Sequence, residues 1–229
     1  MGRLAAARSG LTVLRLQLAY PADRPFRLLC LGAHPDDIEI GAAATIARIR
    51  DEAPTLEVQW VILTGSPARA EEARASAEAL VGPGIDLAIT QEAFRDGYLP
   101  YSGPAVKEAV AAVRDAFDPD LIIAPRVDDL HQDHALLGAL THQLFRDHLV
   151  LAYEIAKTDG DLATPDVYVA LELDEVEAKV AHLHRHFPSQ AGRPWFETEA
   201  FRALLRLRGL EANAPSGFAE AFHARRIVL

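Results

Sequence analysis

Two short polar runs in the sequence contain the residue types that bind a metal ion and activate water. The first run, His34–Glu39, places His34 and Asp37 three residues apart on what we expect to be one tight turn. An imidazole and a carboxylate are ordinary zinc ligands. Asp36 is expected to face the same space, where a carboxylate that does not bind the metal could act as a general base on activated water.

The second run, Arg126–His134, carries two further histidines. His131 and His134 are three residues apart at an expected helix start, so they lie on one face of that helix. One could be a third protein ligand, and the other a proton donor near the leaving group. Asp129 could orient an imidazole by accepting its second N–H. Three protein ligands with an open fourth position are typical of a catalytic zinc rather than a structural one.

Each run also has a simpler interpretation. A His-Pro-Asp-Asp turn could be a loop whose carboxylates cap a helix, and the two histidines could be a polar helix start. Each run, however, directly follows a predicted buried strand. Because ligands bind outside the carboxyl ends of strands in open α/β sheets, the two runs together favour a site over either run alone.

The elements that must position these residues alternate between strands and helices through about two-thirds of the chain. The predicted strands are Leu11–Leu18, Arg27–Leu31, Leu56–Leu63, Ile85–Ile89, Leu121–Ala124, Tyr153–Ile155, Val167–Leu173 and Phe222–Val228. The predicted helices are Gly41–Arg50, Arg69–Leu80, Pro104–Phe117, Asp133–Leu149, Asp174–Phe187 and Thr198–Leu210. Such alternation predicts an α/β fold with a mostly parallel sheet.

The chain is expected to form one domain over residues 1–229, with residues 1–25 as a peripheral N-terminal segment. Its 229 residues contain no repeat and no long linker, and half of them are hydrophobic, which excludes a disordered chain. The loops after Leu31, Leu63 and Ala124 are the expected positions of a site, and the two polar runs follow the first and the third of these residues.

Composition excludes several functional classes. A formal net charge of -10 argues against a nucleic-acid-binding protein, because phosphate binding needs a basic patch. The single cysteine, Cys30, can form neither an internal disulfide nor a thiolate zinc cluster, so any metal must be held by His, Asp or Glu. No segment approaches the ~20 apolar residues of a transmembrane span. No signal peptide is legible, so a cytoplasmic protein is the expectation.

The run Ala33–Glu39 resembles the AHPDDxE motif of the PIG-L/LmbE family of zinc N-deacetylases. The run His131–His134 resembles the second motif of that family, HxDH. The similarity extends from about Leu28 to the C-terminus. It implies a Rossmann-like fold with helices on both faces of the sheet. It also implies removal of acetyl from N-acetylglucosamine-type groups on lipid-linked sugars, sugar–thiol conjugates, chitooligosaccharides or antibiotic precursors.

The resemblance also implies a role for each motif residue. His34, Asp37 and His134 correspond to the zinc ligands of the family. Asp36 corresponds to the general base. His131 corresponds to the group that protonates the leaving amine or stabilises the oxyanion.

Weaker matches suggest residues that contact substrate. Arg69 and Glu72 fit an R-x-x-E pattern of the family, so Arg69 is either a substrate contact or a solvated helix residue. Arg126 is a second candidate for binding substrate. The other specificity candidates are Asp96, Tyr98 and Tyr101, in the expected loop Phe94–Gly103. Some family members have a tyrosine two residues before HxDH, where this chain has Asp129.

The first hypothesis is therefore a zinc-dependent hydrolase that removes acetyl from the amide nitrogen of an N-acetylglucosamine-type conjugate. The alternatives are an amidase acting on another sugar or thiol conjugate, and a sugar- or metal-binding protein without catalysis. Asp36 and His131 argue against pure binding, which needs neither. His and Asp ligands do not force zinc, so another divalent metal stays open. The expected partner is a small-molecule amino-sugar conjugate, and homo-oligomerisation is left open.

Overall fold

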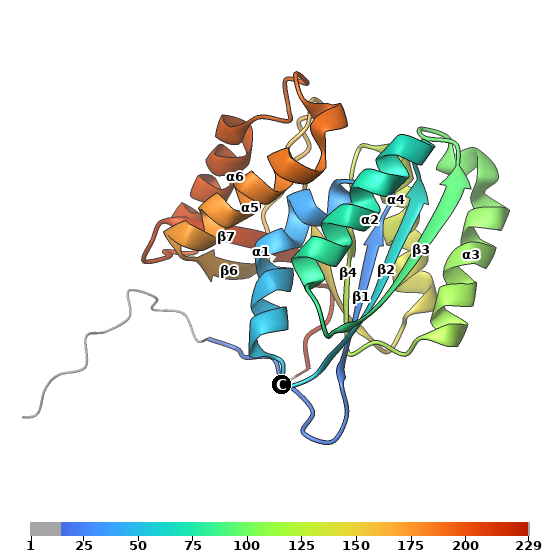
Figure 1. Ribbon diagram of the computed structural model, residues 1–229, viewed down its shortest axis with the longest axis horizontal. Helices are drawn as coiled ribbons and strands as arrows, with labels where there is room; N and C mark the ends of the chain where they lie inside the picture. Colours follow the sequence, from blue (N-terminus) through green and yellow to red (C-terminus); the bar gives the residue numbers. More distant parts are fainter. Residues whose placement is uncertain (1–14, 229) are drawn as a thin grey trace, which may run out of the picture.

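The computed structural model describes residues 15–228, and within them seven strands form one sheet (Figure 1). The sheet order is β3-β2-β1-β4-β5-β7-β6. The strands are β1 Phe26–Gly32, β2 Leu56–Thr64, β3 Asp86–Phe94, β4 Leu121–Pro125, β5 Leu149–Tyr153, β6 Val167–Leu171 and β7 Phe218–His223. All neighbouring pairs are parallel except those that involve β7, which runs antiparallel to both β5 and β6.

Helices cover both faces of this sheet. The α-helices are α1 Asp37–Glu52, α2 Pro67–Val81, α3 Gly103–Ala116, α4 Gln132–Leu144, α5 Leu173–His186 and α6 Thr198–Glu211, with short 3-10 turns at Leu99–Ser102 and Pro188–Gln190. One hydrophobic cluster joins the sheet to α1, α2 and α5, and a second joins it to α3 and α4. The mostly parallel α/β fold expected from the sequence is confirmed.

The alternation of side chains along β1 explains why both faces are covered. Leu28 and Cys30 belong to the cluster under α1 and α2, whereas Leu29 and Leu31 belong to the cluster under α3 and α4. All four side chains are 0% exposed. A strand that is buried on both faces has a continuous run of apolar residues in its sequence, as Leu28–Leu31 does.

The strand order brings the two polar runs together. β1 pairs with β2 on one side and with β4 on the other. The chain therefore reverses its direction of travel across the sheet between β1 and β4, and ligand sites in such sheets lie at the carboxyl ends on either side of that switch point. The first polar run follows β1 and the second follows β4.

Several predicted boundaries were wrong. The helix predicted over Asp133–Leu149 ends at Leu144, and β5 occupies Leu149–Tyr153, where the sequence suggested a strand only from Tyr153. A short apolar run does not distinguish a buried strand from a continuing helix, so the periodicity was uninformative there.

Other strands also differ from their expected limits. The last strand spans Phe218–His223 rather than Phe222–Val228, and β3 continues to Phe94 rather than ending at Ile89. The predicted strand Leu11–Leu18 begins outside the described residues, and its described part, residues 15–18, has no regular secondary structure.

Gly41 lets α1 approach the sheet beneath the first polar run. A Cβ at this position would lie 2.4 Å from Cγ of Tyr153, whose hydroxyl donates a 3.0 Å hydrogen bond to the carbonyl of Leu31. We expect Gly41→Ala to lower the free energy of unfolding by about 1–3 kcal/mol, because the ring is buried and fixed and the helix would have to move away. Urea denaturation measures this difference.

Gly103→Ala is the matched control for that substitution. Gly103 opens α3 with helical dihedral angles, and a Cβ there would meet no atom within 4 Å. We expect this substitution to raise the free energy of unfolding by about 0.4–1 kcal/mol, because alanine has less conformational freedom to lose on folding than glycine. Equal stability of the two variants would contradict the close packing of α1 on Tyr153.

No helix within residues 15–228 is long and apolar enough to cross a membrane.

Candidate active site

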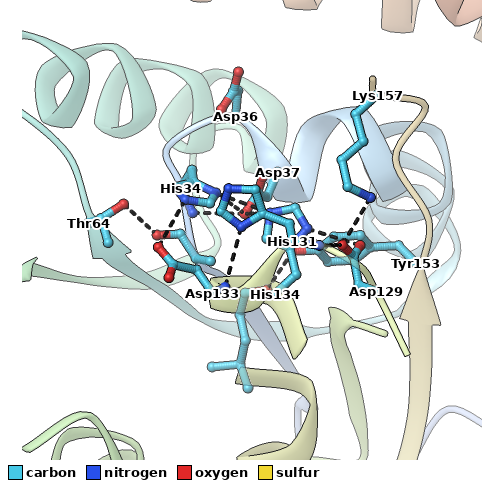
Figure 2. A network of polar contacts seen from close by, with 12 residues as sticks. His34, Asp36, Asp37, Thr64, Asp129, His131, Asp133, His134, Tyr153 and Lys157 are labelled. Carbon is cyan, nitrogen blue, oxygen red and sulfur yellow. Dashed lines mark hydrogen bonds and ion pairs between the residues drawn. The ribbon is translucent and has the colours of Figure 1, made fainter. Parts of the chain in front are cut away.

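Three metal-ligand atoms lie within contact distance of one another where β1 and β4 end (Figure 2). Nδ1 of His34 lies 3.1 Å from Nε2 of His134 and 3.3 Å from Oδ2 of Asp37. Nε2 of His134 lies 3.2 Å from the same carboxylate oxygen. The three residues are 8%, 3% and 4% exposed, so the cluster is buried.

These separations fit a single zinc ion. Zinc holds imidazole nitrogen and carboxylate oxygen at about 2.0–2.2 Å in tetrahedral geometry, which places two ligands of one ion about 3.3–3.5 Å apart. A zinc ion held by these three side chains would keep a fourth coordination position for water. A third imidazole, that of His131, also has a ring nitrogen within 4.8 Å of ring nitrogens of His34 and His134.

Backbone geometry at the start of α1 fixes Asp37. Its Oδ2 accepts a 2.8 Å hydrogen bond from the backbone N–H of His34, so the turn closes on itself. Burial disfavours the charged form of Asp37, but His134 and His34 outweigh it and hold the pKa of this carboxyl well below its usual value. The carboxylate is therefore ionised and available as a ligand.

A chain of polar contacts orients His134 from behind. Its Nδ1 lies 3.1 Å from Oδ2 of Asp129, so the carboxylate that sequence analysis proposed as an orienting group acts on this histidine. Nζ of Lys157 lies 2.9 Å from Oδ1 of Asp129 (Figure 2). The same Nζ lies 2.9 Å from Oδ1 of Asp161. Hydrogen bonds from His134 and Lys157 overcome the effect of burial and lower the pKa of Asp129. An ionised carboxylate there accepts the Nδ1–H of His134 and so orients Nε2 toward the cluster.

Asp133 ties the same cluster to the loop after β3. This residue is 0% exposed, and its carboxylate accepts hydrogen bonds from the backbone N–H of Gly97 (2.7 Å) and Leu99 (3.0 Å). Its Oδ2 also lies 3.5 Å from Nε2 of His34, and Oδ1 of Asp96 lies 3.2 Å from that nitrogen. Sequence analysis gave Asp133 no role, although its place between the two histidines was the available signal.

Asp36 lies beside the three ligand atoms and makes different contacts. Its Oδ1 accepts a 2.6 Å hydrogen bond from Nη2 of Arg69, while its Oδ2 is buried and has no hydrogen-bond partner. Burial raises the pKa of Asp36, and the charge of Arg69 opposes that rise. A carboxylate with one oxygen fixed and the other free matches the requirements of a general base.

His131 presents an N–H group toward the cavity. This residue caps α4, and its Nδ1 accepts a 3.3 Å hydrogen bond from the backbone N–H of Asp133. Burial, together with the nearby His134 and His34, lowers the pKa of His131, so the ring is neutral. A neutral imidazole that accepts at Nδ1 carries its proton on Nε2, where it can donate.

One cavity of about 250 Å³ is lined by His34, Asp36, Asp37, His131 and His134. The other lining residues are Ile40, Arg69, Asp96, Ile155, Lys157, Thr158, Asp159, Gln190, Arg193 and Trp195. Sequence analysis singled out Arg69 and Asp96 among them. The segments 155–159 and 190–195 contain no motif that could have marked the rest as pocket residues.

The remaining candidates for binding substrate lie away from this cavity. Arg126 is 3% exposed, and its guanidinium donates a 2.9 Å hydrogen bond to the carbonyl of Asp161 and lies 3.2 Å from Asp128. Its position favours a role in holding these loops together. Tyr98 and Tyr101 are exposed, and neither lines the cavity.

Comparison with known protein families identifies the family to which this chain belongs. Residues 29–145 match the model of the family described as PIG-L, GlcNAc-PI de-N-acetylase. The matched region includes β1, β4 and both polar runs. The chain belongs to the PIG-L family. Membership in PIG-L makes the protein a deacetylase, an amide-hydrolysing enzyme, as expected from the two motifs.

Solved structures with the same fold carry more than one kind of activity. This chain resembles N,N'-diacetylchitobiose deacetylase from Pyrococcus horikoshii, with a TM-score of 0.68, 21% identity, and coverage of 86% of this chain and 83% of that one. It resembles GalB, a 4-carboxy-2-hydroxymuconate hydratase from Pseudomonas putida, with a TM-score of 0.70, 18% identity, and coverage of 89% of this chain and 98% of that one. It also resembles a zinc-inhibited form of a teicoplanin deacetylase, with a TM-score of 0.62, 16% identity, and coverage of 86% of this chain and 97% of that one. At these identities the likeness concerns the fold, and the reaction must be argued from the site.

Proposed function

We propose that this protein is a zinc-dependent N-deacetylase that hydrolyses the acetamide of an N-acetylglucosamine-type sugar conjugate. One observation carries the proposal: three buried side-chain atoms of His34, Asp37 and His134 lie 3.1–3.3 Å apart, in a cavity that Asp36 also lines. The PIG-L family and the sugar-directed deacetylases that share its fold support the choice of substrate.

His34, Asp37 and His134 would hold the metal. A divalent ion at such a site lowers the pKa of a bound water from 15.7 toward about 7 and polarises an amide carbonyl. His and Asp side chains also bind other divalent metals, so the choice of zinc is itself part of the proposal.

Asp36 is the proposed general base. Arg69 fixes its Oδ1, which leaves Oδ2 as the proposed acceptor of a proton from the attacking water. The raised pKa of Asp36 suits this task, because a stronger base accepts the proton more readily. Once protonated, Asp36 can pass the proton to the nitrogen of the departing amine.

His131 is the proposed donor to the developing oxyanion. Its Nδ1 is already occupied by the backbone N–H of Asp133, so Nε2–H is the group left to donate. A hydrogen-bond donor fixed in advance stabilises charge that appears only in the transition state. This assignment favours oxyanion stabilisation over proton donation by His131.

Acetate release is the test of the proposed function. Metal-stripped protein would be assayed against a panel of N-acetylglucosamine conjugates, and zinc would then be added in steps up to one ion per chain. Stepwise addition matters because a teicoplanin deacetylase with this fold is known in a zinc-inhibited form. Acetate release that returns with the first equivalent of zinc supports the proposal. One tightly bound zinc without acetate release from any conjugate points instead to another amide, or to a binding role.

We expect Asp129→Asn to weaken zinc binding about 10–100-fold, the usual effect of removing a group that orients a metal-binding histidine. The asparagine keeps the size of the side chain but loses the charge that fixes the ring of His134. Zinc competition with a chromophoric chelator measures the affinity. Asp128→Asn, at an exposed carboxylate one residue earlier, is the control and should leave the affinity unchanged.

A further inference from the structure

One segment between α5 and α6 supplies a wall of the cavity that the proposed chemistry does not use. Gln190, Arg193 and Trp195 all line the cavity. The segment is anchored at Phe196, which is 2% exposed and packs edge-on against Phe201. The indole of Trp195 lies edge-on to Phe196, with 5.6 Å between ring centroids, and remains partly exposed. A flat apolar ring is therefore held at the cavity wall.

One turn of α2 fixes this segment relative to Asp36. Glu72 accepts hydrogen bonds from the backbone N–H (2.9 Å) and the hydroxyl (2.5 Å) of Ser189. Three residues earlier on the same helix, Arg69 donates to Asp36. The R-x-x-E pattern thus connects the proposed base with the segment that carries Gln190, Arg193 and Trp195.

Arg193 is a cation without a protein partner in this cavity. The other two cationic side chains of the lining are neutralised, Arg69 by Asp36 at 2.6 Å and Lys157 by Asp129 and Asp161 at 2.9 Å. Among the described residues, none makes a hydrogen bond or ion pair with the guanidinium of Arg193, which is exposed. A free guanidinium beside an aromatic face suits a ligand that has both a ring and an anionic group.

We infer that Arg193 and Trp195 form a subsite for an acidic substituent of the substrate. The indole of Trp195 packs on a sugar ring, whose C–H groups give it an apolar face. Arg193 pairs with a phosphate or carboxylate attached to that sugar. The inference rests on the proposed deacetylase function and deepens it: the preferred substrates are acidic amino-sugar conjugates rather than neutral oligosaccharides.

Tryptophan fluorescence can report on this subsite without turnover. The chain has two tryptophans, and the other one, Trp60, is 0% exposed within the core, so a ligand-induced change reports Trp195. The protein would be the zinc-loaded Asp36→Asn variant, whose hydrolysis is expected to be at least about 100-fold slower, so that binding can be measured before turnover. The probes are N-acetylglucosamine 1-phosphate, the carboxymethyl glycoside and the neutral methyl glycoside. Trp195→Phe should remove the signal.

We expect the acidic probes to bind at least about 10-fold more tightly than the methyl glycoside, as a charge-assisted pair would produce. Arg193→Gln should abolish this preference and leave the affinity for the methyl glycoside within about 2-fold, because no charged contact is lost there. Asp159→Asn removes an opposite charge from the same cavity and should maintain or increase the preference. The ratio of affinities for the two acidic probes shows whether the subsite favours phosphate or carboxylate.

Equal affinity for acidic and neutral probes would overturn the inference. So would a preference that survives Arg193→Gln but disappears when zinc is removed, because the anion would then be binding the ion. The test of the subsite and the test of the proposed function can fail independently of each other. A preference that depends on Arg193 without acetate release by the wild-type protein would overturn only the deacetylase assignment. Acetate release without a preference would overturn only the subsite.

Discussion

Asp36→Asn is expected to lower kcat for acetate release by about 10²–10⁴-fold while the protein keeps its metal. Arg69 donates to Oδ1 of Asp36, so the amide of the variant turns its carbonyl oxygen toward Arg69. Its NH₂ group then occupies the position of the free oxygen, where it cannot accept a proton. The structure of the site is preserved, and only the base is lost.

Kinetics and elemental analysis of the same preparation measure both parts of this prediction. Asp37→Asn is the informative comparison, because the neighbouring carboxylate lies 3.2–3.3 Å from both imidazoles and should be needed to retain the metal. Metal loss in Asp36→Asn with retention in Asp37→Asn would reverse the two roles. Full activity of Asp36→Asn would remove the general base from the mechanism.

His134→Ala is expected to abolish tight metal binding and, with it, acetate release. His134 is one of the three proposed ligands and is itself held by Asp129. With one of three protein ligands absent, the remaining His34 and Asp37 form an incomplete site. The measurement is zinc content after gel filtration in the presence of a weak chelator.

His131→Ala provides the contrast, because the two histidines are neighbours in sequence and space but have different contacts. Nδ1 of His131 is engaged with the backbone of α4, and its proposed role is in the transition state. We expect this variant to keep its zinc and to lose about 10²–10³-fold in kcat, the usual effect of removing an oxyanion donor. Zinc loss from both variants would mean that His131 is itself a ligand.

The sequence was most informative where local chemistry and the strand pattern coincided. His34 and His134 could be assigned to one sheet edge because each follows a buried apolar run, and the carboxyl ends of parallel strands share an edge. The adjacency of β1 and β4 was not legible, because the order of strands in a sheet depends on long-range packing. Nor was the antiparallel direction of β7, which lies between β5 and β6, because strand direction also depends on long-range packing.

The rest of the cavity could not be predicted because its residues lack a local signature. Lys157 lies in a polar loop, and only folding places its ammonium 2.9 Å from Asp129. Arg69, which fits the R-x-x-E pattern, and Arg126 were both candidates for binding substrate in the sequence. The structure separates them by their acidic partners: Arg69 faces Asp36 in the cavity, whereas Arg126 lies against Asp161 and Asp128.

The turn of α2 that carries Arg69 and Glu72 also constrains how this enzyme can evolve. Arg69 holds Asp36 and Glu72 holds Ser189, so one helical turn positions both the proposed base and the segment of the proposed subsite. Substitutions that share a partner in this way do not add independently. Epistasis should therefore connect residues 69–72 with residues 188–196. A library that diversifies the second stretch alone will draw most of its active members from sequences that keep Ser189.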